Sequence, residues 1–192
     1  MLVTKPYMRE RAVEYARTWA LRRNPLFADF SGIGGNCTNF VSQCILAGSC
    51  VMNYTPDFGW YYISLNDRAP AWSGVEFFYN FLTGAEPYAA ANGGVGPYAV
   101  EVRQDEVAPG DVIQYANTRG DWYHTVMVTG VEGSEILVSA QSNDALDRPL
   151  SSYNYAGARF LRIEGVRIEL NDDRCYSLLL AGGIDSASNE SV

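Results

Sequence analysis

Apolar residues recur three and four positions apart along the first half of the chain, which is the spacing of one face of a helix. The pattern predicts a helix over residues 9–22, which ends before Asn24-Pro25 because the residue before a proline disfavours helical backbone. A second helix is expected to begin near Thr38 and to end at Gly48, and a short third one, over residues 75–82, to be closed by Gly84. The predicted buried side of the second helix comprises Phe40, Val41, Cys44 and Ala47.

Beyond residue 97 the apolar residues gather in short β-branched runs, and this change of pattern predicts strands. A helical front followed by strands with short connections is typical of an α+β protein in which helices pack on an antiparallel sheet. We therefore expect that fold class, with a cleft between the two layers. The expected strands lie near residues 98–103, 111–116, 123–130, 135–141, 158–164 and 175–180.

One segment has the composition expected around a reactive thiol. Gly34 and Gly35 allow backbone angles that a side chain would forbid, and Asn36 is a favourable residue to precede a helix. Cys37 would then lie in the first helical turn, whose backbone amides lack partners within the helix. Such amides stabilise both a thiolate and the oxyanion that forms when a carbonyl is attacked.

The start of a helix alone does not activate a thiol enough for catalysis. It contributes about 0.3–1 kcal/mol, whereas a shift of one pKa unit requires about 1.36 kcal/mol. A cysteine nucleophile therefore needs a second group, which is usually an imidazolium. The chain has a single histidine, His124, near the start of an expected strand. Cys37 and His124 are thus the predicted nucleophile and base.

A catalytic histidine usually bonds through its second ring nitrogen to an orienting side chain, often on the adjacent strand. The strand expected after His124 ends in polar residues, among which Gln141, Asn143 and Asp144 can each fill that role. Alternation along the strand favours Gln141, with Asp144 as the second choice.

Five stretches of the chain resemble the bacterial "putative amidase domain" family, in the same order and over roughly residues 7–163. That family is similar to the NlpC-type and CHAP peptidoglycan hydrolases, which have a papain-like fold. The stretches are residues 24–30 (NPLFADF), 36–44 (NCTNFVSQC), 110–115 (GDVIQY), 124–129 (HTVMVT) and 142–153 (SNDALDRPLSSY).

The resemblance implies a papain-like fold of the NlpC type, with Cys37 as the nucleophile and His124 as the base of an amide hydrolase. It also implies a peptide or peptidoglycan-fragment substrate, cleaved through a thioester at a stem-peptide or muramoyl amide bond. The chain departs from the family at Gln141, where many relatives are expected to carry a second histidine, so the third member of the site stays open between Gln141 and Asp144. The candidate substrate-binding residues are Asn36, Asn39, Trp60 and Trp122.

Two other functions are compatible with the same residues. The thioester can pass its acyl group to an amine or alcohol instead of water, which would make the protein an acyltransferase or transamidase. Alternatively the site has lost catalysis and the domain is a binding module, a reading that the glutamine at position 141 favours.

Composition indicates one globular domain over residues 1–184, with residues 185–192 as a flexible tail. The net charge of −8 argues against a nucleic-acid partner, because a phosphate-binding surface is basic. No apolar run approaches the ~20 residues of a membrane helix, so no membrane partner is expected. The N-terminus lacks the apolar core of a signal peptide, so we expect a cytoplasmic protein, one released by a non-Sec route, or a chain trimmed from a longer precursor.

The four cysteines allow one possible disulfide. Cys37 and Cys44 lie in one expected helix about 10.5 Å apart, at 1.5 Å per residue, which exceeds the ~7 Å limit for a disulfide. Cys50 and Cys175 could form a bridge in an oxidising compartment or remain two free thiols. The chain has no Cys-x-x-Cys motif and only one histidine, so neither a metal nor another cofactor is expected.

Overall fold

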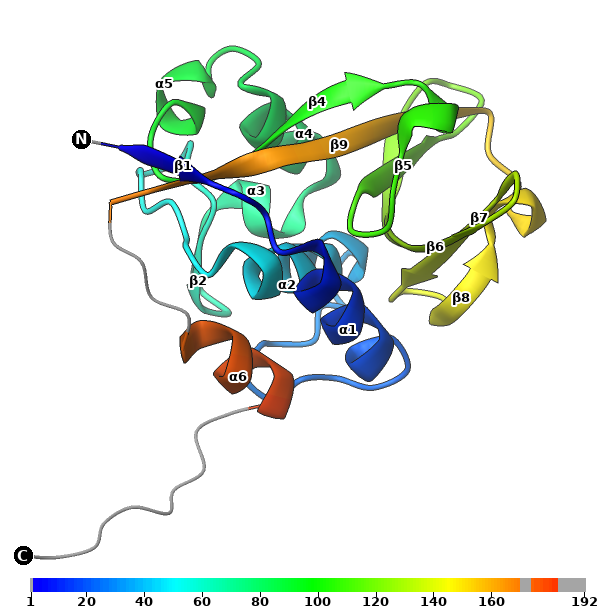
Figure 1. Ribbon diagram of the computed structural model, residues 1–192, viewed down its shortest axis with the longest axis horizontal. Helices are drawn as coiled ribbons and strands as arrows, with labels where there is room; N and C mark the ends of the chain where they lie inside the picture. Colours follow the sequence, from blue (N-terminus) through cyan, green and yellow to red (C-terminus); the bar gives the residue numbers. More distant parts are fainter. Residues whose placement is uncertain (1, 170–173, 183–192) are drawn as a thin grey trace, which may run out of the picture.

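A computed structural model describes residues 2–169 and 174–182 of the protein. Figure 1 shows helices α1 (Arg9–Trp19) and α2 (Cys37–Ser49) lying against a sheet, with α6 (Arg174–Ala181) on the side of these helices away from the sheet. The strands of this sheet pair antiparallel. The predicted α+β class, with helices packed on an antiparallel sheet, is therefore confirmed.

The main sheet has seven strands within the described residues, in the order β1-β9-β5-β6-β7-β8, with β4 also paired to β9. Five of them, β4, β5, β6, β7 and β9, lie where strands were predicted between residues 98 and 164. The strands are β1 (Val3–Lys5), β4 (Gly96–Val102), β5 (Val112–Ala116), β6 (Trp122–Glu132), β7 (Glu135–Ala140), β8 (Ala145–Pro149) and β9 (Gly157–Ile168).

The other two strands, β1 and β8, were not predicted from the pattern. β8 carries Asp147 and Arg148 and ends at Pro149, a composition that disfavours a central strand but is tolerated at the edge of a sheet. β1 is three residues long and pairs with the C-terminal part of β9. Both strands form because a longer neighbouring strand offers them hydrogen-bond partners.

Short elements between α2 and β4 cover the core. The predicted third helix is confirmed as α4, which is followed by Gly84 in the left-handed conformation at φ +71°. The short elements are β2 (Tyr62–Ser64), β3 (Asp67–Arg68), α3 (Pro70–Ser73), α4 (Val75–Thr83) and α5 (Ala89–Asn92).

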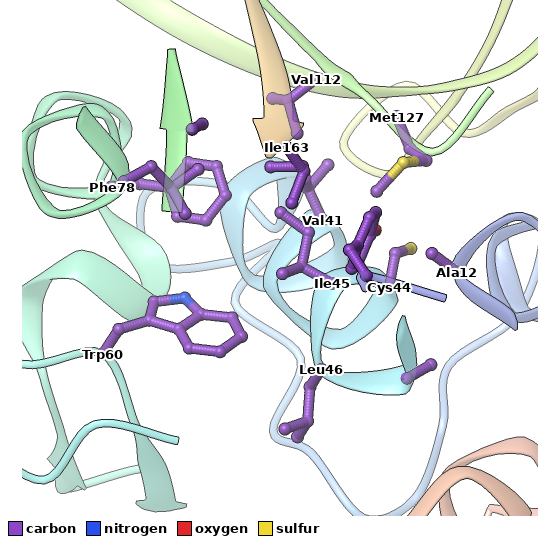
Figure 2. Close-up of a cluster of buried hydrophobic side chains, with 14 of the residues drawn as sticks. Ala12, Val41, Cys44, Ile45, Leu46, Trp60, Phe78, Val112, Met127 and Ile163 are labelled. Carbon is purple, nitrogen blue, oxygen red and sulfur yellow. The ribbon is translucent and has the colours of Figure 1, made fainter. Parts of the chain in front are cut away.

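Helix α2 lies at the centre of the core. All of its residues are buried, including the predicted side formed by Phe40, Val41, Cys44 and Ala47. Figure 2 shows its side chains surrounded by residues from other helices, a loop and the sheet. The helix is buried on every side because α1 and α6 cover the faces that the sheet leaves open. The labelled neighbours from outside the helix are Ala12, Trp60, Phe78, Val112, Met127 and Ile163.

The prediction that this helix ends at Gly48 is wrong, because α2 continues to Ser49 and is capped by Cys50 at φ +57°. Gly48 is nevertheless required by packing. A Cβ at this position would lie 2.3 Å from Cε2 of Tyr7, which is closer than any real side-chain contact. Gly48 therefore lies within the helix and does not end it. Its missing side chain leaves room for the ring of Tyr7 to pack against α2.

The strand predicted near residues 175–180 is also wrong, since these residues form helix α6. A short apolar run does not distinguish a strand from a helix by period alone, and here packing on α1 and α2 decides. Cys175 of α6 forms a disulfide with Cys50, with 5.5 Å between the Cα atoms, so the bridged alternative is the one observed. The predicted tail, residues 185–192, lies outside the described residues.

No helix in the described part of the chain has both the length and the apolar character needed to cross a membrane.

Candidate active site

Cys37 is the first residue of helix α2 and thus lies in its first turn, as predicted, and only 7% of the residue is exposed. The loop before it contains Gly34 at φ +115° and Gly35 at φ +109°, both in the region that strongly favours glycine. A Cβ on Gly35 would lie 3.4 Å from Oγ of Ser142. A Cβ on Gly34 would meet nothing within 4 Å, so the backbone conformation and not a lack of space is what favours glycine at these two positions.

Asn36 precedes α2, but its side chain holds the loop instead of capping the helix. Its Oδ1 accepts hydrogen bonds from the backbone N–H of Phe30 at 2.9 Å and from Nδ2 of Asn39 at 2.8 Å. Its Nδ2 donates to Oε1 of Gln141, and its backbone N–H donates to Oγ of Ser142. Asn36 is 1% exposed, so the structure gives it the role of a buried brace directly behind Cys37.

Gln141 belongs to the same brace. Its Nε2 donates to the carbonyl oxygens of Trp19 at 2.8 Å and Arg22 at 2.9 Å, while its Oε1 accepts from Asn36. These bonds use both amide hydrogens and join the end of α1 to the loop that carries Cys37. Within the described residues, Gln141 makes no hydrogen bond to His124.

His124 lies near the start of β6, directly opposite Tyr115 of β5 in the antiparallel register. Its ring centroid is 5.7 Å from that of Tyr115 and 6.2 Å from that of Tyr123. Only 8% of His124 is exposed, and this burial lowers the pKa of the imidazole to about 4. The ring is therefore neutral at pH 7 in the free protein and can accept a proton.

Cys37 and His124 line the same pocket, which has a volume of about 320 Å³. One wall consists of Gly34, Gly35 and Cys37 from the loop and the first turn of α2. Strands of the sheet contribute further lining residues, among them Tyr115 and His124. The structure thus brings together the two residues predicted to form the catalytic pair.

A hydrogen bond between two threonines fixes the helix against the sheet beside this pair. Oγ1 of Thr38, the residue after Cys37, lies 2.9 Å from Oγ1 of Thr125, the residue after His124. Thr125 Oγ1 also accepts from Nε2 of Gln114 at 3.1 Å, and Oε1 of Gln114 accepts from Nε of Arg159 at 2.7 Å. This buried network sets the position of the first turn of α2 on β6.

Two predicted substrate-binding residues lie in the interior instead of the pocket wall. Asn39 donates to the carbonyl of Ala28 at 3.1 Å and accepts from Nε1 of Trp72 at 2.7 Å. Trp60 is fully buried, and its Nε1 donates to Oγ of Ser42 at 3.0 Å. The hydrogen-bonding groups of Asn39 and Trp60 are thus used by other buried residues, and neither side chain lines the pocket.

Trp122 and Asp144 are nearer the surface, but neither lines the pocket. The ring of Trp122 stacks with the guanidinium of Arg159, whose Cζ is 4.1 Å from the ring centroid. The carboxylate of Asp144 forms an ion pair with Arg23 at 2.9 Å. Asp144 is therefore paired with Arg23 and forms no hydrogen bond with His124 within the described residues.

Among the three candidates for orienting His124, Asn143 is the one that lines the pocket. It is exposed and has a positive φ of 74°. No hydrogen bond links His124 to Gln141, Asn143 or Asp144 within the described residues.

Sequence reasoning missed several residues that complete the pocket. Tyr115 could have been found, since the expected strands 111–116 and 123–130 place it near His124 if they pair as a hairpin. Arg148 and Tyr153 fall in a stretch that carries the family resemblance, but no pattern assigned them a role. The further lining residues are Tyr123, Ser142, Arg148 and Tyr153.

The arrangement suits acyl transfer through a thiol. A cysteine, a neutral imidazole and the start of a thirteen-residue helix meet in one pocket, which can supply a nucleophile, a base and oxyanion donors. Among the described residues, no group of three or more His, Cys, Asp and Glu side chains could hold a metal ion.

The fold and the pocket together define an α+β protein in which a cysteine at the start of a helix and a histidine of the sheet line one pocket. The chain belongs to the "Putative amidase domain" family, which matches residues 6–163. This family indicates amide hydrolysis as the class of reaction.

The chain is also similar to the uncharacterized protein YhbB of Bacillus subtilis (strain 168), with 34% identity over 145 residues. The match covers 72% of this chain and 42% of YhbB, so the chain spans less than half of that relative. No solved structure matches the chain significantly.

Proposed function

We propose that the protein hydrolyses amide bonds with Cys37 as the nucleophile and His124 as the general base. The observation that carries this proposal is the pocket that Cys37 shares with the sole histidine of the chain. Membership of the amidase family supports the reaction class, and the neutral state of His124 at pH 7 supports its role as a base.

The proposed mechanism has two halves. His124 takes the thiol proton of Cys37 as the sulfur attacks the substrate carbonyl, and the backbone amides at the start of α2 stabilise the oxyanion. The protonated His124 then donates to the leaving nitrogen as the C–N bond breaks, which leaves a thioester on Cys37. Water next attacks the thioester, giving its proton to His124, and the acid product leaves as Cys37 recovers its proton.

The substrate class and the wider relationship are part of the proposal. We infer a peptide or peptidoglycan fragment, cleaved at a stem-peptide or muramoyl amide bond, from the resemblance to NlpC-type and CHAP hydrolases. A thiol at the start of a helix that packs on an antiparallel sheet carrying the base supports a papain-like fold.

The test compares wild-type protein with Cys37→Ala and Cys44→Ala on purified peptidoglycan fragments. Cys44 is the matched control, since it is the other free cysteine and is fully buried in the same helix. We expect Cys37→Ala to reduce hydrolysis by at least about 10³-fold, because removing the nucleophile of a covalent mechanism costs at least this much. Cys44→Ala should retain turnover after correction for the folded fraction. Liberated amines and new carboxylates are measured by mass spectrometry.

Other outcomes distinguish the alternative functions. A product that carries an added amine or alcohol would show that the thioester is transferred and not hydrolysed. Binding of the fragments with unchanged affinity in Cys37→Ala, without turnover by either protein, would identify a binding module and contradict the proposed hydrolase.

A further inference from the structure

Arg148 stands out among the described residues that line the pocket, because it is the one arginine there and no lysine, aspartate or glutamate accompanies it. Cys37 and His124 are the other ionisable groups besides the tyrosines, and burial keeps His124 uncharged at pH 7. The chain as a whole has a net charge of −8. The positive charge in the pocket is therefore opposite in sign to the net charge of the chain.

The guanidinium of Arg148 is held in place by two hydrogen bonds and by an aromatic ring. Its Nε donates to Oγ of Ser152 at 2.7 Å, and its Nη2 donates to the carbonyl oxygen of Ser152 at 3.0 Å. Its Cζ lies 4.0 Å from the ring centroid of Tyr153, another lining residue. These contacts use part of the five-donor fork and fix its orientation, so a ligand would not have to order a free side chain.

The carboxylates nearest to Arg148 in the sequence are engaged by other arginines. Asp147 pairs with Arg17 at 3.1 Å, and Asp144 pairs with Arg23 at 2.9 Å. Within the described residues, Arg148 forms no ion pair. Its charge is therefore not neutralised by the protein and remains available to the pocket.

We propose that Arg148 binds a carboxylate of the substrate and thereby selects anionic compounds for attack by Cys37. Arginine suits this role because its planar fork matches the two oxygens of a carboxylate. The pocket places this cation together with the nucleophile, the base and the aromatic rings of Tyr115, Tyr123 and Tyr153. The inference rests on the proposed function and adds a specificity-determining residue and a substrate class to it.

Two small alkylating reagents of nearly equal size test this proposal. Iodoacetate carries a carboxylate, whereas iodoacetamide is neutral, and both alkylate a thiolate. The rate of Cys37 alkylation by each reagent is measured at pH 7 by fragmentation mass spectrometry and divided by the rate for a free thiol. The proteins are wild type, Arg148→Gln, Arg148→Lys, Arg162→Gln and His124→Ala. Arg162 serves as the charge control, because it lines a different pocket, with Tyr7 and Arg9.

We expect Arg148→Gln to lower the iodoacetate-to-iodoacetamide rate ratio at Cys37 by about tenfold, which corresponds to about 1.4 kcal/mol. Arg148→Lys should keep most of the ratio, because it keeps the charge, and Arg162→Gln should leave it unchanged. An unchanged ratio in Arg148→Gln would overturn the proposal. If both rates also fall by the same factor, Arg148 has a structural role instead.

The same experiment separates this inference from the proposed function. If Cys37 reacts with iodoacetamide like a free thiol in both wild type and His124→Ala, the catalytic pair fails, whatever the ratio shows. If Cys37 of wild type reacts with iodoacetamide faster than a free thiol, but the rate ratio is the same in wild type and Arg148→Gln, the proposed catalytic pair is supported and carboxylate binding by Arg148 is contradicted.

Discussion

His124 is the residue on which the chemistry of the pocket depends. It is 8% exposed, and burial in a low-dielectric setting disfavours its charged form. In the proposed mechanism, Cys37 therefore meets an uncharged imidazole, which accepts a proton as the sulfur attacks. The sequence pointed to an imidazolium only as the group that usually activates such a thiol, and it carried no signal of the depth at which the ring lies.

The lowered pKa of His124 predicts a stability that falls as the pH falls. The unfolded chain binds a proton near pH 6.5, but the folded protein does so only near pH 4, so the unfolded state is favoured increasingly between these values. The loss at pH 4 is about 3 kcal/mol at most. Urea unfolding of wild type and His124→Gln between pH 4 and 8 measures it.

The difference between the two stability curves isolates this effect, because the chain has one histidine and the other titrations are common to both proteins. Wild type should lose stability relative to His124→Gln as the pH drops below 6.5. A relative stability of wild type that stays constant between pH 6.5 and 4 would contradict the lowered pKa of His124.

At the scale of elements, the site depends on how α2 meets β6. The helix carries Cys37 and the strand carries His124, and the hydrogen bond between Thr38 and Thr125 links the positions directly after them. Asn36 and Gln141 brace the same end of the helix from the side of α1. Polar contacts that are buried and fully used in this way set the separation of two elements more sharply than apolar packing does.

Thr38→Val should destabilise the protein by about 1–3 kcal/mol, since it removes a buried hydrogen bond while keeping the shape of the side chain. It should also slow the alkylation of Cys37 by iodoacetamide. Urea unfolding and the labelling rate are the measurements.

Thr125→Val is the control for a direct effect on the thiol, because Oγ1 of Thr38 lies 3.8 Å from Sγ of Cys37, whereas no hydrogen bond joins Thr125 to that thiol within the described residues. Both variants should slow labelling if the helix–strand link is what matters. Slowing by Thr38→Val alone would assign the effect to the thiol contact, and additive stability changes in the double variant would contradict the link.

At the scale of the whole molecule, helix α2 carries a pocket-lining thiol at one end and is followed by a disulfide-bonded cysteine at the other. Cys37 begins the helix in the pocket, and Cys50 caps the other end and is bridged to Cys175 of α6. The helix has thirteen residues, which places its ends about 20 Å apart at 1.5 Å per residue. The disulfide is thus a covalent tie between α2 and α6 that lies far from the reactive thiol.

Reduction of the Cys50–Cys175 disulfide should lower the free energy of unfolding by about 2–5 kcal/mol, because the bridge closes a long loop, with 125 residues of sequence separation. The labelling rate of Cys37 should not change while the protein stays folded. Urea unfolding with and without a reductant measures the effect, and the Cys50→Ser/Cys175→Ser double variant is the control, which a reductant should not affect. Equal stability of the oxidised and reduced proteins would contradict this prediction.

Much of the fold followed from local patterns, and the failures have identifiable causes. The helix over residues 75–82 and five strands were predicted because their spacing is a property of neighbouring residues. Gly48 was misread as a helix end, since its purpose is to admit Tyr7 from another segment. Helix α6 was misread as a strand, since a short apolar run fits both periods and packing on α1 and α2 decides between them.

By itself, the sequence determined which groups can perform chemistry: a thiol after two glycines at a helix start, and one histidine to serve it. It did so because residue identity and local spacing do not depend on the rest of the fold. Only the tertiary structure decided that Gln141 bonds to Asn36 and that Arg148 faces the pocket. These facts depend on contacts between distant segments, and such contacts are set by how layers pack and which strands pair.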